Sequence, residues 1–206
     1  HEDRAGVADL VEQRTGIPLM EGRSSAMNRW TMALSLLFMG LIIGTLLFAH
    51  LYLRTQSPDY PPEGITLPSP LLPGIAVGVL LIGSVLHYVA VTGIEKPTIN
   101  RLALGLTGGT IAGVIAAVLV IVHATQLTFS HSTNAYGSSF WALGVVELLF
   151  IGLGVVMSGA TAFWAVQSKR PPRENDHVRQ IGWYWYTTTA IGLVVFAVLY
   201  LLPYLL

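Results

Sequence analysis

The sequence predicts an all-α integral membrane protein: a bundle of five transmembrane helices with a cytoplasmic N-terminus and an external C-terminus. Of its 206 residues, 53% are hydrophobic and only 11% are charged, whereas a soluble domain has about 25% charged residues. Nearly all the charge lies outside five long apolar stretches. Each stretch is long enough to cross roughly 30 Å of hydrocarbon at about 1.5 Å per residue.

The five apolar stretches place the spans at residues 30–53, 69–94, 102–127, 138–166 and 181–204, within one transmembrane domain of residues 29–206. Residues 1–28 are polar and are expected to form a cytoplasmic N-terminal segment. The first stretch is too long for a signal-peptide core and lacks a cleavage site, so it is interpreted as a span. Residues 57–73 contain six prolines, at positions 58, 61, 62, 68, 70 and 73, and should not be helical.

The distribution of basic residues predicts the orientation. Ten of the 11 Lys and Arg residues flank one side of the spans, and Arg54 lies on the other. Because cytoplasmic loops carry an excess of basic residues, the N-terminus is expected in the cytoplasm. Aromatic residues should mark the two interfaces. The inner ones are Trp30, Trp164, Trp183, Tyr184 and Trp185, and the outer ones Tyr52, Tyr60, Tyr136, Tyr200 and Tyr204.

Glycines recur at four-residue spacing along several spans. The pairs are Gly40/Gly44, Gly74/Gly78, Gly105/Gly109 and Gly109/Gly113. Such ridges let helix backbones approach closely in lipid. Glycine is common in membrane helices anyway, so packing within the bundle is favoured over a special dimerisation face.

Glu147 is the one acidic or basic side chain well inside a span. Unpaired and ionised there, it would cost at least about 2.5–3.5 kcal/mol, so it must pair, meet water or stay protonated. His123 lies near the end of the preceding span, and a short loop should make these spans antiparallel neighbours. We therefore expect Glu147 and His123 to form a buried polar network, directly or through a water. A protonated carboxyl that only fixes helix packing is the simpler alternative to a proton relay.

No cofactor or catalytic site is expected within this chain. Cysteine is absent, which excludes thiolate chemistry and iron–sulfur clusters. His50 and His123 both lie near the outer side, and His87 has no inner partner, so matched haem ligands are not expected. Metal-ligand spacings, phosphate loops and nucleophile–base pairs are lacking. Thr187, Thr188 and Thr189 should bond back to their own helix. The basic residues form no stripe that would bind nucleic acid.

Three segments resemble subunit III of haem-copper cytochrome c oxidases, in its short five-span bacterial form. Residues 132–140, STNAYGSSF, are similar to the segment that leads into the family's penultimate helix. Residues 183–200, WYWYTTTAIGLVVFAVLY, are similar to its last helix. FAHLYLR followed by DYPPEG at residues 59–64 resembles an aromatic span followed by a Pro-Pro loop. The resemblance covers about residues 30–206.

The sequence also departs from that family. The His-x-x-His pair of the penultimate helix aligns with Glu147 and Phe150. The His and Asp of the last helix align with Tyr186 and Thr189. The family's buried glutamate before the Pro-Pro loop falls near Met39, so a role for that glutamate cannot be transferred. Glu147 is a candidate replacement for part of the missing polar network.

The resemblance implies an accessory subunit without a redox centre. Family members pack against the catalytic subunit I, in a complex that also has subunit II, bind structural phospholipid, and protect the proton-uptake entrance and metal centre. Haem and copper are then expected in the partner subunits, in a proton-pumping complex of aerobic respiration in the plasma (inner) membrane of a prokaryote. Two alternatives remain: a small proton or ion transporter that uses Glu147, and an accessory subunit of a nitric oxide reductase. A di-haem anchor is disfavoured by the histidine positions.

Overall fold

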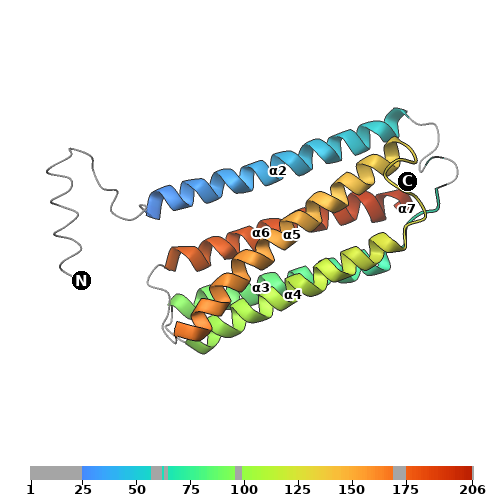
Figure 1. Cartoon of the computed structure of the whole chain (residues 1–206). Helices are drawn as coiled ribbons and strands as arrows, with labels where there is room; N and C mark the ends of the chain where they lie inside the picture. Colours follow the sequence, from blue (N-terminus) through green and yellow to red (C-terminus); the bar gives the residue numbers. More distant parts are fainter. Residues whose placement is uncertain (1–24, 57–61, 63–64, 96–98, 169–174, 206) are drawn as a thin grey trace, which may run out of the picture.

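The protein is a bundle of five long helices, shown in Figure 1. The computed structural model describes residues 25–56, 62, 65–95, 99–168 and 175–205. The helices are α2 (Ser25–Gln56), α3 (Leu71–Glu95), α4 (Ile99–Thr125), α5 (Ala135–Ser168) and α6 (Asn175–Phe196), and α6 continues through a π-helical turn η1 (Ala197–Leu201) into the short α7 (Leu202–Leu205). No strand occurs among the described residues.

All five helices are long and apolar enough to cross a membrane, so the predicted class of all-α multi-pass membrane protein is confirmed. The candidate spans are Arg29–Gln56, Leu71–Gly93, Asn100–Thr125, Ala135–Phe163 and His177–Leu205. Most of the expected N-terminal segment, residues 1–24, lies outside the described residues, and α2 already begins at Ser25. Residues 65–70 contain no helix, as their prolines predicted. Pro73 lies instead in the first turn of α3, where N–H groups have no helical partner anyway.

The helices are arranged around a close α3–α4 hairpin. α3 packs on α4 and α6, α4 packs on α5, and α2 packs on α5 and α6. Figure 1 shows α5 crossing the bundle obliquely, from beside α2 at one end to beside α4 at the other. The end of the bundle at which α5 lies beside α2 is called the Arg54 end. There α2 and α4 finish, and α3 and α5 begin. The opposite one, which contains Arg29 and the start of α4, is the Arg101 end.

Glycines on α4 explain the closeness of its hairpin with α3. A Cβ atom at Gly105 would lie 2.5 Å from both the backbone N of Ala90 and the carbonyl oxygen of Leu86. A Cβ at Gly109 would collide with the ring of His87. Because only glycine permits these approaches, the predicted packing role of this ridge within the bundle is confirmed for α4.

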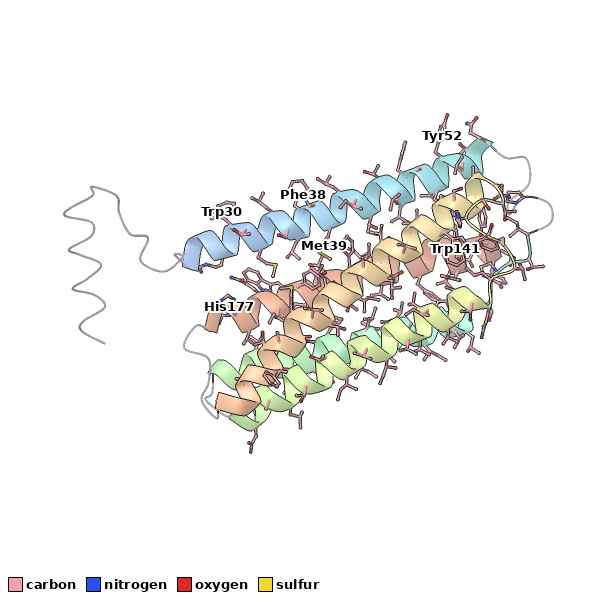
Figure 2. The ribbon with its side chains drawn as sticks, viewed as in Figure 1. Trp30, Phe38, Met39, Tyr52, Trp141 and His177 are labelled. Atoms are coloured by element: carbon pink, nitrogen blue, oxygen red, sulfur yellow. The ribbon has the colours of Figure 1, made fainter. Side chains whose placement is uncertain are left out.

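Large apolar side chains cover much of the surface of the bundle. On α2, Trp30 and Phe48 are 71% and 72% exposed. Figure 2 shows Trp30, Phe38 and Tyr52 directed away from the other helices and Met39 directed toward them. In water such a surface would drive aggregation, but lipid is as apolar as these side chains. The exposed apolar shell is thus the surface expected of a chain dissolved in a bilayer.

The last helix changes its hydrogen-bonding pattern near the Arg54 end. The N–H of Leu202 donates to the carbonyl oxygen of Ala197, five residues earlier, in the π-helical turn. Pro203 follows directly, and its ring, which lacks an N–H, crowds the carbonyl of Leu199 four residues back. Widening of the turn accommodates the proline, and it alters the direction in which Leu199 and Tyr200 project. Both of these side chains are buried.

Candidate functional site

His123 lies in the last turn of α4, at the Arg54 end, and is unusually placed for a polar side chain. It is only 5% exposed. Neither of its ring nitrogens has a hydrogen-bond partner among the described residues. Its ring instead meets the ring of Tyr200 edge-on, with centroids 5.3 Å apart and an interplanar angle of 69°. Since buried polar groups are normally paired, two unpaired nitrogens on one imidazole point to water or another ligand at this position.

Glu147 projects from α5 toward α6. A Cβ placed on Gly192 of α6 would lie 3.0 Å from its Oε1 atom, so this glycine leaves the room that the carboxyl group occupies. Glu147 is therefore held between α5 and the last span, and it does not point into lipid from the outside of the bundle.

A small cavity joins these three polar side chains. It has a volume of about 40 Å³, and His123, Glu147 and Tyr200 all line it. The remaining lining is mostly apolar and comes from α3, α4 and α6, for example Ala76 and Val120. A cavity needs only about 10–15 Å³ to hold a water that has polar partners. The structure thus brings Glu147 and His123 to one cavity without a direct hydrogen bond from His123, and the water-mediated form of the predicted network is the one that fits.

Tyr200 is the member of this site that sequence reasoning missed. It was predicted to mark the outer interface, but it is 8% exposed and packs against Phe140 and Phe196. Its ring lies inside the bundle, in the π turn before Pro203, and is not exposed to lipid. The sequence feature that could have indicated the inward direction of Tyr200 was Pro203, near the end of an otherwise regular apolar span.

Two further spaces meet His123. A polar vestibule of about 110 Å³ is lined by Thr66, Ser69, Gln126 and Thr128, among others, and by His123. Thr66, Ser69, Gln126 and Thr128 are all exposed. A larger, apolar groove of about 400 Å³ runs between α4 and α5, and His123, Trp141 and Tyr200 line it. His123 is the one residue that borders all three spaces.

The other two histidines within the spans have structural surroundings. His50 of α2 shares a hydrogen bond of 2.8 Å between its Nδ1 and the Oγ of Ser139. His87 of α3 donates from Nδ1 to the carbonyl oxygen of Gly83 at 2.8 Å, and its ring stacks on Trp185 with centroids 5.0 Å apart. In the described part of the chain, no three His, Cys, Asp or Glu side chains are grouped in a way that could hold a metal ion.

Several aromatic residues assigned to interfaces are buried. Tyr184 and Trp185 are 4% and 0% exposed, and Tyr136 is also buried. The Tyr184 hydroxyl donates to the carbonyl oxygen of Phe150 at 2.8 Å, which ties α6 to α5. These three side chains therefore serve contacts between helices and are not exposed to lipid. Trp30, Tyr52 and Tyr204 are exposed, whereas Tyr60 lies outside the described residues and the side chain of Trp164 is not described.

The threonines of α6 behave in two ways. Thr188 bonds back to the carbonyl oxygen of Tyr184 at 3.0 Å, as predicted. Thr189 differs, because it reaches across to α3, where its Oγ1 lies 2.7 Å from the Oγ of Ser84 and donates to the carbonyl oxygen of Leu80 at 3.3 Å. The threonine hydroxyls of α6 therefore form hydrogen bonds both within α6 and across to α3.

A scan against protein-family models gives no match, and no curated protein is detectably similar in sequence.

Proposed function

We propose that this chain is a non-catalytic subunit III of a haem-copper terminal oxidase, the cytochrome c oxidase of aerobic respiration. Its role would be to stabilise the catalytic subunit I, beside subunit II, and to bind phospholipid. Haem, copper and the redox chemistry would belong to the partner subunits. The chain would lie in the plasma membrane of a prokaryote with its N-terminus in the cytoplasm, an orientation favoured by its ten basic residues on one side.

The proposal rests on the position, within the fold, of two segments that resemble the family. STNAYGSSF and WYWYTTTAIG supply several of the buried contacts around α5 and α6. From the first segment, Asn134 Oδ1 accepts a 2.8 Å hydrogen bond from the N–H of Gly137 and caps α5, while Phe140 is buried against the rings of Phe129 and Tyr200. From the second come the Tyr184–Phe150 bond and the fully buried Trp185. The segments that carry the likeness thus contribute buried contacts between the helices.

The surface of α2 supports a partner within the membrane. Gly40 and Gly44 are exposed, and a Cβ added at either would meet nothing within 4 Å. Phe38 and Leu41, exposed by 61% and 55%, lie beside them. Glycine ridges favour close contact with another helix, and this one is not covered by the described part of the chain. A helix of subunit I is the occupant that the proposal requires.

Purification in mild detergent tests the proposed function. A tag on this chain should recover a larger membrane protein with haem absorbance that oxidises reduced cytochrome c and consumes oxygen. The chain separated from its partner should be colourless. Recovery of a haem protein that reduces nitric oxide and not oxygen would point to the nitric oxide reductase alternative. A chain that retains haem after separation would contradict the proposal.

The site around Glu147 favours a second candidate, a small proton or ion transporter. Glu147, His123 and Tyr200 border one cavity within the spans, and intramembrane carboxyl groups are common in ion pathways. This function requires that the chain alone, in liposomes, dissipate a proton or cation gradient, and that Glu147→Gln abolish the flux. Absence of flux together with recovery of an oxidase would exclude it.

A further inference from the structure

We propose that His123 is a proton-transfer gate, through which Glu147 exchanges protons with the aqueous phase at the Arg54 end of the bundle. The inference concerns this chain's own side chains and does not depend on an oxidase partner. It begins from the position of His123 between the polar vestibule and the cavity that contains Glu147.

The vestibule provides the aqueous side of the gate. Its mouth consists of Thr66, Ser69, Gln126 and Thr128, which are exposed and uncharged. A 2.8 Å hydrogen bond between the Oγ1 atoms of Thr66 and Thr128 ties the loop before α3 to the loop after α4. At about 110 Å³, this space has room for several waters at about 30 Å³ each, and its polar lining supplies partners for them.

The inner cavity provides the side that faces Glu147. Besides His123, its titratable lining residues are Glu147 from α5 and Tyr200 from η1. No other titratable side chain among the described residues lines either space. The cavity of about 40 Å³ has room for a water that these groups can bond, so a hydrogen-bonded link from His123 to the carboxyl group needs no movement of a helix.

The imidazole of His123 is suited to the transfer because both of its nitrogens lack a protein partner in the described residues. A hydronium ion from the aqueous phase donates a proton to the bare ring nitrogen in the vestibule and becomes water, and the N–H on the other nitrogen releases its proton to the cavity water. That water delivers a proton to the Glu147 carboxylate, which becomes a neutral carboxyl. The imidazole ends neutral as the opposite tautomer, and a ring flip or the reverse transfer resets it. His87 is a useful contrast, since its Nδ1–H is committed to the carbonyl oxygen of Gly83.

Hydrogen–deuterium exchange at the Glu147 carboxyl tests the gate. The full chain in lipid nanodiscs is transferred from H₂O to D₂O, and the shift of the infrared carboxyl C=O band is followed in time. Glu147→Gln should remove the band and thereby assign it. His123→Phe should slow its exchange by about a hundredfold, the lower range of what a positioned acid–base group contributes. Unchanged thermal unfolding in the variant shows that the bundle is intact.

A matched pair of tryptophan variants tests the route without altering either titratable group. Gln126 lines the vestibule, whereas its exposed neighbour Thr125 lines the apolar groove. Gln126→Trp should slow exchange at Glu147 by blocking the vestibule, and Thr125→Trp should leave it at the wild-type rate. The proposal is overturned if His123→Phe exchanges as fast as the wild type, or if the two tryptophan variants behave alike. The comparison of Gln126→Trp with Thr125→Trp remains decisive even if His123→Phe does not fold.

Discussion

The glycine ridges of α4 and α2 share a four-residue spacing but have opposite surroundings. On α4, added Cβ atoms at Gly105 and Gly109 would collide with α3. On α2, the same atoms at Gly40 and Gly44 would meet nothing. The first ridge has its partner within the chain, and the second faces outward. The comparison teaches that spacing identifies a surface able to admit a neighbouring helix, while the surroundings determine which neighbour it is.

Removal of Trp185 should have the largest effect on the buried side of this comparison. The indole is fully buried, fits against Gly113 of α4 and Gly154 of α5, and stacks on His87. Trp185→Ala should lower the free energy of unfolding by about 3–5 kcal/mol, because it removes the side chain that fills the space left by two glycines. Unfolding in detergent mixtures, followed by circular dichroism, measures the loss. Trp30→Ala, on an exposed residue, is the control, and equal losses would contradict the packing described for the core.

A single methyl group should distinguish the two ridges directly. Gly105→Ala places a Cβ 2.5 Å from backbone atoms of Ala90 and Leu86, which cannot rotate away. We expect a loss of about 1–3 kcal/mol, typical of overpacking. Gly40→Ala has open space and should leave stability unchanged or slightly raised, since alanine favours helix more than glycine. If both variants were equally stable, the close approach of α3 and α4 would be in error.

Tyr184→Phe should produce a smaller loss and sharpen the account of the α5–α6 contact. The variant removes only the hydroxyl that donates to the Phe150 carbonyl at 2.8 Å. Hydrogen bonds between membrane helices contribute about 0.6 kcal/mol on average, so the expected loss is of this size. Tyr204→Phe, on an exposed tyrosine, is the matched control and should be neutral. A loss above that of Gly105→Ala would show that this bond carries more of the fold than its geometry suggests.

Much of the fold could be predicted because hydrocarbon imposes a simple length rule. Five apolar stretches separated by charged or proline-rich joints predict five helices, and short connections predict antiparallel neighbours. The inward face of each helix could not be predicted. In lipid both faces are apolar, so the usual periodicity disappears, as Phe48 and Leu47 on neighbouring positions of α2 illustrate: the first is 72% and the second 9% exposed. For the same reason the sequence did not reveal that Tyr184 and Trp185 face the interior of the bundle.

The candidate site was predictable in part, for a related reason. A lone carboxyl and a histidine on two successive antiparallel spans have few other groups to meet, so the proximity of Glu147 and His123 to one cavity followed from topology. Tyr200 did not, because its direction depends on the π turn before Pro203. The vestibule also depends on tertiary contacts, since its lining comes from the loop before α3 and from the end of α4 and the loop that follows it.

The smallest effect on the chain itself should come from changing the exposed ridge of α2. Replacing Gly40 and Gly44 together by leucine fills open space, so the stability of the separated chain should remain within about 0.5 kcal/mol, as for other surface changes. In the complex, the same side chains would hold a partner helix away, and the haem protein should no longer be recovered with the tagged chain. Gly152→Leu on α5, which also meets open space, should preserve recovery. If the α2 variant still recovered the haem protein in full, the partner would bind another face of the chain. The glycine ridges of α2 and α4 would then differ only in burial.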